Sequence, residues 1–325
     1  MKAWVYSAYG QSDVLRLKEV LRPSFKDDEV LVRIHSVSLN ASDWEFLTGS
    51  PFYARIGGLF KPGVKILGSD IAGYVEAVGS SVTRFKVGDA VVGDALSVFG
   101  GLAEYAALPE KLLIQKPEGI GLAEASTFPQ AGVVALQGLR DKGKIEAGDN
   151  VLINGAGGGA GTFAIQLAKM YGAVVTGVDS AEKQKAMRAV GADHVFDYRA
   201  DDFTADGEQY DLILDFVASR SPLDHKRSLK PKGRYVVVGG AVLRLSQTLL
   251  LSPFVKWLSG KEMGILAYQQ NNDDLAYLLG LNKAGTINPV IDQHFKFEDT
   301  PQALQYLGDG HAKGKIIITF DHDAG

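Results

Sequence analysis

The sequence predicts an α/β protein with two domains, one built on a doubly wound parallel sheet and one rich in short strands. Two observations lead to this prediction. Short alternating apolar and polar segments, broken by glycine and proline, fill residues 1–120. Apolar runs then alternate with helical patterns, beginning at a glycine-rich stretch, INGAGGGAG, at residues 153–161. A chain of 325 residues is long enough for two domains of ordinary size.

The composition indicates a protein with a large apolar core and no sulfur chemistry at cysteine. Hydrophobic residues make up 46% and charged residues 22%, and the net charge is −4, so we expect no basic surface for nucleic acid. The chain has no cysteine, which excludes disulfides, thiolate nucleophiles and zinc sites that use sulfur. No apolar window reaches the length of a signal peptide or a membrane span. We therefore expect a cytoplasmic protein that does not bind membranes.

The first domain is predicted from its strand patterns. Residues 29–40, EVLVRIHSVSLN, place Val30, Val32 and Ile34 on one face of a half-buried strand. Runs such as GYVEAVGSSV and GDAVVGDAL continue the pattern between glycines and aspartates. Many short strands of this kind favour an antiparallel, barrel-like domain.

Six apolar runs beyond residue 150 predict the strands of a parallel sheet. They cover residues 151–154, 174–178, 194–197, 212–217, 235–239 and 262–267. Between the first two, Ala164, Leu167, Ala168 and Tyr171 share one helix face, and SAEKQKAMRAVGA predicts a second helix with Ser180 as its N-cap. Strands that alternate with helices form right-handed crossovers, so six of them predict a Rossmann domain, the doubly wound fold that binds dinucleotides.

The last part of the chain returns to shorter elements. Helices are expected near residues 273–282 and 300–307, and a strand at residues 315–320. Residues 243–260, LRLSQTLLLSPFVKWLSG, are apolar, but the run is short and Pro253 interrupts it. We expect a buried or interface helix there.

The glycine-rich stretch matches a dinucleotide fingerprint in its first small residue and its last two glycines, Ala156-x-Gly158-x-x-Gly161. A small residue at 156 permits a tight turn, Gly158 lets the backbone approach a pyrophosphate, and Gly161 lets the helix pack on the strand. Gly159 and Ala160 open the helix, whose N-terminus favours phosphate. The alternative is a tightly packed turn without a ligand.

Three residues after the second strand bear on the choice of cofactor. Asp179 stands where an acidic group accepts hydrogen bonds from a ribose 2′-OH and repels a 2′-phosphate, which favours NADH. Ser180 follows it in the same loop. Lys183, one helical turn on, is placed to pair with a 2′-phosphate, which would favour NADPH, although a solvated lysine explains it as well.

Five segments, met in this order along the chain, resemble those of one superfamily. They are SLNASDWEFLTG, LGSDIAGYVEAVGSSVTRFKVGDAVVG, FPQAGVVALQGL, GAGGGAGTFAIQLAK and LGDGHAKGKIIITF. In the first, Asn40, Asp43 and Gly49 match an Asn-x-x-Asp-x(5)-Gly pattern. The chain resembles the medium-chain dehydrogenase/reductase superfamily, and in particular its zinc-independent quinone oxidoreductases.

The resemblance implies a domain organisation. Residues 1–123 and 268–325 would form a β-rich GroES-like barrel, and residues 124–267 the six-stranded Rossmann domain. A cleft between the two domains would hold the cofactor and the substrate.

The resemblance also bears on metal. Zinc alcohol dehydrogenases of this superfamily carry His-Glu where this chain has Ser69-Asp70, and a cysteine ligand near Ala131. The six histidines show no ligand spacing, so we expect no metal. Without a Lewis acid to lower the pKa of an alcohol, reduction of an activated acceptor is the more natural reaction.

Candidate catalytic residues come from the same resemblance. Asn40 and Asp43 would lie near the nicotinamide and the substrate, although Asn40 is also explained as a turn residue and Asp43 as a helix N-cap. Tyr53 could donate a proton or a hydrogen bond, or pack at the surface. On the cofactor side, Tyr198 resembles an adenine contact. Gly239 and Gly240 end the fifth strand beside the expected nicotinamide.

These observations predict an NAD(P)H-dependent, zinc-independent reductase that transfers hydride to a quinone, an enone or a similar activated carbonyl. An alcohol or aldehyde oxidoreductase of the same superfamily is one alternative, and a cofactor-binding regulatory protein without turnover is another. Its partner would be a small-molecule substrate. The segment KEMGILAY hints at a homodimer.

Overall fold

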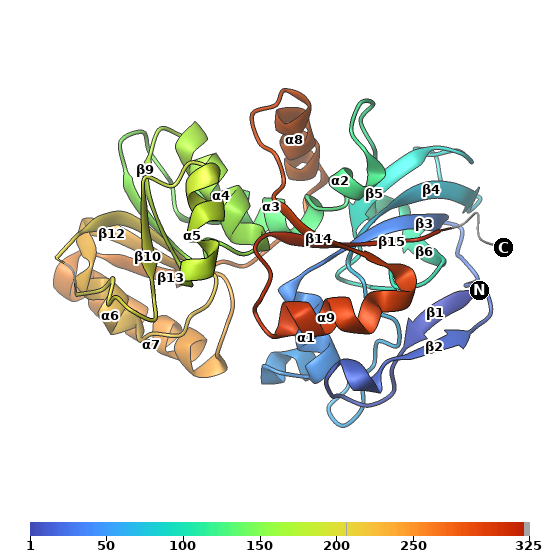
Figure 1. The fold of residues 1–325 in the computed structure, drawn as a ribbon, viewed down its shortest axis with the longest axis horizontal. Helices are drawn as coiled ribbons and strands as arrows, with labels where there is room; N and C mark the ends of the chain where they lie inside the picture. The colour runs from blue at the N-terminus through green and yellow to red at the C-terminus, as the bar shows by residue number, and fades with distance from the viewer. Residues whose placement is uncertain (206, 322–325) are drawn as a thin grey trace. The chain divides into compact units, whose positions relative to one another are not determined.

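The computed structural model describes residues 1–205 and 207–321 (Figure 1). By its internal contacts the chain divides into two compact units. The first holds residues 1–131, 270–285 and 291–325, and the second residues 132–269 and 286–290. The boundary between these units in the chain falls within α3 (Pro129–Gln137), and α2 (Leu122–Ala125) packs on strands of the first unit.

The first unit is built around a seven-stranded mixed sheet. Its strands are β3 (Glu29–Leu39), β4 (Asp70–Val78), β5 (Ala90–Asp94), β6 (Tyr105–Pro109), β7 (Leu113–Gln115), β14 (Ile291–Lys296) and β15 (Lys315–Thr319). The order is β14-β15-β3-β4-β5-β7, and β6 also pairs with β3. Pairing is antiparallel as predicted, except that β14 and β15 run parallel.

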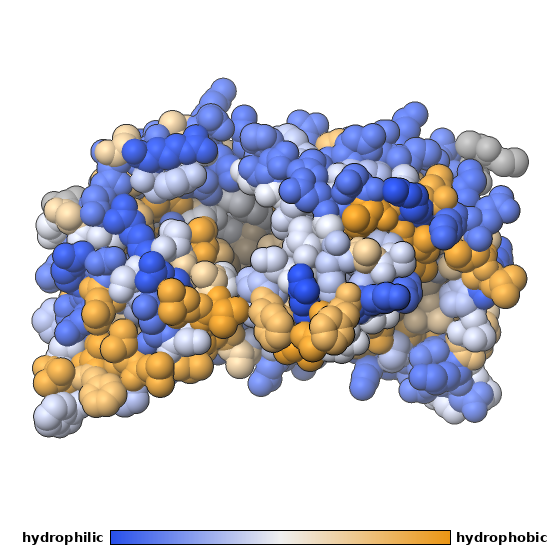
Figure 2. Space-filling view, turned by 90° about the horizontal axis from the view of Figure 1, so that it is seen from below, coloured by the Kyte–Doolittle hydropathy of each residue, from blue (hydrophilic) through white to orange (hydrophobic). Residues whose placement is uncertain are grey.

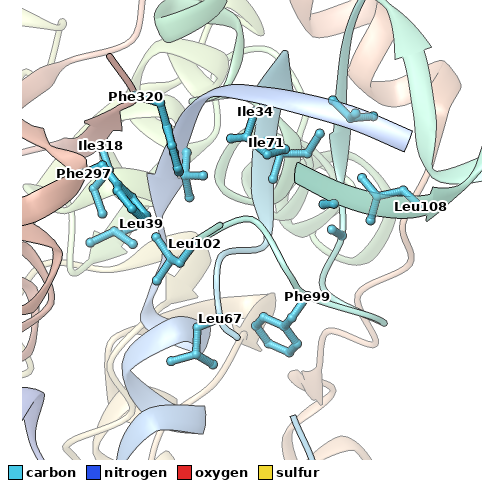
Figure 3. Packing of buried hydrophobic residues seen from close by; sticks show 14 of the residues in the cluster. Ile34, Leu39, Leu67, Ile71, Phe99, Leu102, Leu108, Phe297, Ile318 and Phe320 are labelled. Carbon is cyan, nitrogen blue, oxygen red and sulfur yellow. The ribbon is translucent and has the colours of Figure 1, made fainter. Parts of the chain in front are cut away.

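The core of this unit forms where alternate residues of β3 and its neighbours point inward. Figure 3 shows Ile34 of β3 and Ile71 of β4 among the residues that pack there. Phe297 and Phe320, from the C-terminal part of the chain, stack with ring centroids 4.4 Å apart. The C-terminal strand thus completes a core that begins near the N-terminus, and this brings Lys315 beside residue 40.

Shorter elements surround this sheet. They are the hairpin β1 (Lys2–Val5) and β2 (Arg16–Glu19), helices α1 (Ala41–Thr48), α8 (Asn272–Lys283) and α9 (Thr300–Gly308), and 3₁₀ turns η1 (Ser12–Val14), η2 (Phe52–Arg55), η3 (Glu110–Leu112) and η6 (Phe297–Asp299). Helix α1 follows β3 directly and ends at Gly49, whose φ of 63° is the left-handed conformation common at helix C-termini.

The second unit contains a six-stranded, fully parallel sheet. Its strands are β8 (Asn150–Asn154), β9 (Val174–Asp179), β10 (His194–Asp197), β11 (Tyr210–Asp215), β12 (Leu229–Val237) and β13 (Glu262–Ile265). The order β10-β9-β8-β11-β12-β13 is the doubly wound order of a Rossmann fold. The prediction of six parallel strands is confirmed, although β11 ends at Asp215, two residues earlier than expected.

Helices cover both faces of this sheet (Figure 1). They are α4 (Gly159–Met170), α5 (Gln184–Ala189), α6 (Pro222–Arg227) and α7 (Val242–Ser259), with the 3₁₀ turn η5 (Ala181–Lys183) before α5 and the π-helical turn η4 (Gly138–Lys142) after α3. The strands are apolar on both sides because both sides are covered. The face that carries Ile213 and Tyr235 packs under α7, through Val255.

The apolar segment 243–260 forms most of α7. Thr248 and Val255 are buried, whereas Leu250, Phe254 and Trp257 are exposed. Figure 2 shows this apolar surface in orange on the second unit, at the left of the view. The helix is therefore only partly buried. Within residues 1–205 and 207–321, no helix is long and apolar enough to span a membrane.

Candidate functional site

The glycine-rich turn lies at the carboxyl edge of the parallel sheet, between β8 and α4. This is the switch point of the sheet, because β9 follows on one side of β8 and β11 on the other. A Cβ at Gly161 would lie 2.2 Å from the carbonyl oxygen of Gly155, so only glycine permits this close packing of α4 on the turn. Ala156 is completely buried within this turn.

Gly158 fits a dinucleotide. A Cβ at this position would contact only the Gly155 carbonyl oxygen, at 3.5 Å, so the space in front of the helix is open. Gly158 is the N-cap residue of α4 and offers no side chain to cap the first N–H groups, at Gly159 and Ala160. The N-terminus of α4 is therefore left available for a phosphate group.

Asp179 makes contacts that its position in the sequence does not reveal. Its carboxylate accepts hydrogen bonds from the backbone N–H groups of Gly157 at 3.0 Å and Ser180 at 2.8 Å. The ammonium of Lys183 lies 3.3 Å from Oδ1, and both side chains are about 11% exposed. The carboxylate therefore holds the glycine-rich turn in place, and its charge is balanced by Lys183.

The other predicted cofactor residues lie at the same edge of the sheet. The backbone N–H of Tyr198, which follows β10, donates to the carbonyl of Asp179, and Tyr198 is 47% exposed. Gly239 has open space where a Cβ would stand. Gly240 has a φ of 113°, and a Cβ there would lie 2.5 Å from the carbonyl oxygen of Val217. The turn after β12 thus packs against the turn after β11.

A buried polar cluster at the end of β11 was not predicted. Asp215 Oδ1 accepts hydrogen bonds from Asn154 at 2.8 Å and from the backbone of Val217 and Ala218 at 3.0 and 2.9 Å. Its Oδ2 accepts one from the Tyr235 hydroxyl at 2.9 Å.

His225 completes this cluster. Its Nε2 lies 3.2 Å from Asp215 Oδ2, and its ring stacks on Tyr235. Burial raises the pKa of Asp215, but the contact with His225 and the backbone N–H groups outweigh burial and lower it. Ala218 adopts a φ of 50°, an uncommon conformation that these hydrogen bonds hold. The sequence signal that could have indicated this cluster is Asp215 itself, an aspartate at the end of a strand beside the switch point.

In the first unit, Asn40 is the N-cap residue of α1 and is 8% exposed. Its side-chain Oδ1 accepts a hydrogen bond from the Lys315 ammonium at 2.6 Å, and its Nδ2 donates to the Ser69 hydroxyl at 3.2 Å. The Lys315 ammonium also donates to the carbonyl of Leu39, at 3.1 Å. Lys315 is almost completely buried, and nothing in the apolar strand pattern around it predicted this contact.

Asp43 is completely buried. Its carboxylate accepts hydrogen bonds from the backbone N–H groups of Asn40 and Gly68, both at 2.9 Å. Burial raises its pKa to about 6, against the opposing effect of those hydrogen bonds. The N-cap of α1 is Asn40, and Asp43 reaches back to it from the first turn.

Asp70 lies beside the same lysine. Its Oδ2 is 3.6 Å from the Lys315 Nζ, and its Oδ1 accepts a hydrogen bond from the backbone of Gln130. Burial raises the pKa of Asp70 to about 8, although Lys315 opposes the shift. Ser69 and Asp70 thus form part of the environment of Asn40. In the sequence, the only reason to single them out was that zinc enzymes carry His-Glu at these positions.

Tyr53 lies in η2, and its hydroxyl donates to the Glu45 carboxylate at 3.0 Å. Burial raises the pKa of Glu45 to about 6. Tyr53 is half-buried and not fully packed. The three predicted catalytic residues all belong to the first unit, and the predicted cofactor residues all belong to the second.

In the part of the chain that the structure describes, no three histidine, cysteine, aspartate or glutamate side chains group as a metal site. His322, one of the six histidines, lies outside the described residues.

Residues 26–118 match the family described as "Alcohol dehydrogenase GroES-like domain", and residues 190–318 match "Zinc-binding dehydrogenase". A 2-methylene-furan-3-one reductase of Solanum lycopersicum is 34% identical over 98% of this chain and 79% of its own. An "NADPH-dependent alkenal/one oxidoreductase, chloroplastic" of Arabidopsis thaliana is 33% identical over the same shares.

Among solved structures, a quinone oxidoreductase from Coxiella burnetii superposes with a TM-score of 0.85 and 28% identity, over 98% of this chain and 99% of its own. The family matches and the structural match, which covers nearly the whole chain, agree in indicating GroES-like and Rossmann elements. The chain therefore belongs to the medium-chain dehydrogenase/reductase superfamily, among the oxidoreductases related to quinone oxidoreductases.

Proposed function

We propose that the protein is an NAD(P)H-dependent reductase of quinones, enones or similarly activated carbonyls. The observation that carries the proposal is the open space at Gly158, before the N-terminus of α4 and at the switch point of the sheet. The relatives named as an alkenal/one oxidoreductase and a quinone oxidoreductase support the same class of acceptor.

The chain would bind the cofactor through its second unit. The N–H groups of Gly159 and Ala160 would meet the pyrophosphate, the Asp179–Lys183 pair the adenosine ribose, and Tyr198 the adenine. When bound, a reduced nicotinamide supplies the hydride. Gly239, which leaves open space after β12, would let the nicotinamide ring approach the backbone closely.

The first unit would bind the acceptor. The Asn40 amide would donate a hydrogen bond to the acceptor oxygen as negative charge develops there, a role that requires no titration. Phe52, Ile56 and Phe60 are 67%, 80% and 87% exposed around Tyr53 and would form an apolar surface for a quinone ring or an enone chain. A proton must still reach the oxygen or the adjacent carbon, and Tyr53 is the candidate donor.

The choice between NADH and NADPH belongs to this proposal. Asp179 would favour NADH, but Lys183 lies 3.3 Å away and weakens the repulsion of a 2′-phosphate. The Arabidopsis relative is named for NADPH. We propose that both cofactors bind and that NADH is modestly preferred.

Oxidation of NADH and NADPH by a panel of acceptors tests the function. The panel contains a quinone, an enone, a saturated aldehyde and, with the oxidised cofactors, a primary alcohol. We expect turnover with the quinone or the enone and little with the others. Turnover of the alcohol alone would replace the proposal by an alcohol dehydrogenase, and cofactor binding without turnover by a regulatory protein.

Two further expectations complete the proposal. We propose a homodimer, because β13 is an edge strand and the neighbouring α7 exposes Leu250, Phe254 and Trp257. Light scattering after size exclusion measures its mass. We propose a cytoplasmic location. Cell fractionation tests this against a chloroplast location, because the Arabidopsis relative is named as chloroplastic.

A further inference from the structure

The side-chain amide of Asn40 can present either of two chemically opposite groups. Its oxygen accepts hydrogen bonds and its nitrogen donates them, and the two ends have nearly the same shape. Stabilisation of a developing oxyanion requires the nitrogen end. Something in the protein must therefore fix which end of the amide faces which neighbour.

The neighbours of Asn40 differ in their ability to do this. The Ser69 hydroxyl, 3.2 Å from Nδ2, can donate or accept and so accommodates either orientation. The Lys315 ammonium, 2.6 Å from Oδ1, can only donate. A flipped amide would point its N–H groups at this ammonium, in a site from which water is largely excluded.

Lys315 is well held in this position. It is 1% exposed, it also donates to the carbonyl of Leu39 at 3.1 Å, and the Asp70 carboxyl lies 3.6 Å away. Burial lowers the pKa of Lys315, and the nearby carboxyl groups of Asp70 and Asp43 oppose this shift. The ammonium comes from β15, whose residues Ile316–Thr319 pair with β3, so its place relative to Asn40 is fixed by the sheet.

We propose that Lys315 is a positioning residue that orients the Asn40 amide with its oxygen inward, so that the nitrogen end is the one available to an acceptor. The inference rests on the proposed reductase function for its catalytic consequence. The orientation itself is a property of the protein without cofactor, and it can be measured separately.

The first test is a double-mutant cycle in the full-length protein. Lys315→Met keeps the length of the side chain and removes the donor. We expect it to lower kcat by about tenfold, a fraction of the 10²–10³ attributed to loss of a whole oxyanion donor, with the KM for cofactor changed less than about threefold. In an Asn40→Ala background the same change should have almost no further effect on kcat. The matched control is Lys313→Met, which alters an exposed lysine two residues away.

Loss of a buried charge could prevent Lys315→Met from folding. The pair Lys315→Met/Asp70→Asn removes both ionisable groups, and Asp70→Asn alone is its reference, since Lys315 still holds the amide there. We expect kcat to fall about tenfold between the reference and the pair. An equal fall in the Asn40→Ala background, or no fall, would overturn the inference.

The second test does not depend on activity. In protein with ¹⁵N-labelled asparagine and no cofactor, the side-chain signals of Asn40 are identified by their loss in Asn40→Ala. We expect them to shift in Lys315→Met, or in the pair relative to Asp70→Asn, and to stay in place in Lys313→Met. Unchanged signals would overturn the inference. A wild type that reduces no acceptor but shows the shift would refute the proposed function and leave the inference standing.

Discussion

The Asp179 carboxylate accepts a hydrogen bond from the backbone N–H of Gly157 at 3.0 Å. An acidic residue at the end of the second strand is thereby part of the glycine-rich turn itself. Under the proposed function it would affect cofactor binding in two ways, through the shape of the turn and through its charge near the proposed ribose position.

Asp179→Ser should therefore have two effects. It should shift the ratio of kcat/KM values toward NADPH by about tenfold or more, roughly 1.4 kcal/mol, because the carboxylate no longer opposes the 2′-phosphate. It should also weaken binding of both cofactors, because the Gly157 N–H loses its acceptor. Lys183→Met is the comparison and should shift the ratio toward NADH. If the ratio does not move in Asp179→Ser, the carboxylate does not act at the ribose.

Gly158→Val should abolish cofactor binding and leave the protein folded. The backbone there is extended, and the new Cβ would meet only the Gly155 carbonyl oxygen, so the side chain occupies the space needed by a pyrophosphate. Calorimetric titration with reduced cofactor measures the effect. Gly121→Val, at the N-cap of α2 and also in open space, is the matched control. Unaltered affinity in Gly158→Val would assign the turn a structural role only.

Tyr235→Phe should lower the free energy of unfolding by about 1.5–3 kcal/mol, the range for a hydrogen bond to a charged group. Tyr235 is 1% exposed, and its hydroxyl is 2.9 Å from Asp215 Oδ2. Denaturant unfolding gives the value. Tyr277→Phe, at a side chain 45% exposed on α8, should change it very little. Equal effects of the two changes would mean that the buried cluster contributes no special stability.

The stability of the protein should depend on pH through Asp70. Its pKa is raised in the folded protein, to about 8, so the folded state holds this proton more tightly than the unfolded state. The associated stabilisation is complete below the unfolded pKa and is lost as pH rises through about 8. Asp70→Asn should therefore flatten the decline in unfolding free energy between about pH 5 and pH 8.5. If the unfolding free energy of Asp70→Asn declined as steeply as that of the wild type, the pH dependence would come from other groups.

Purified protein never exposed to chelators should contain well under one equivalent of zinc. The reason is the absence of cysteine and the presence of Ser69-Asp70 where zinc enzymes carry His-Glu. Elemental analysis measures the content. Stoichiometric zinc whose removal abolishes activity would contradict the expectation, and would require ligands from distant parts of the chain.

Much of the second unit could be predicted because its signals are local. Each buried parallel strand is a short apolar run, and each helix shows its own periodicity, so six strands and their order of appearance follow from the sequence. The glycines of the turn are also readable, because the close packing of Gly161 on Gly155 occurs within seven residues. In the first unit the alternation of apolar and polar residues predicted the strand β3, but it did not predict which strands pair with β3.

The contacts within the candidate site are not local. Lys315 and Asn40 are 275 positions apart, and only the pairing of β15 with β3 brings them together. Local pattern would place a lysine at the start of a strand in solvent, because burying a charge is costly unless partners compensate it. Those partners, like the His225 beside Asp215, come from other strands and helices. The sequence by itself determined the Rossmann architecture and the glycine-rich turn, because periodicity and glycine content act within a few residues. Tertiary structure alone decided which polar groups are buried together, because the stability of a buried charge depends on what the rest of the chain packs against it.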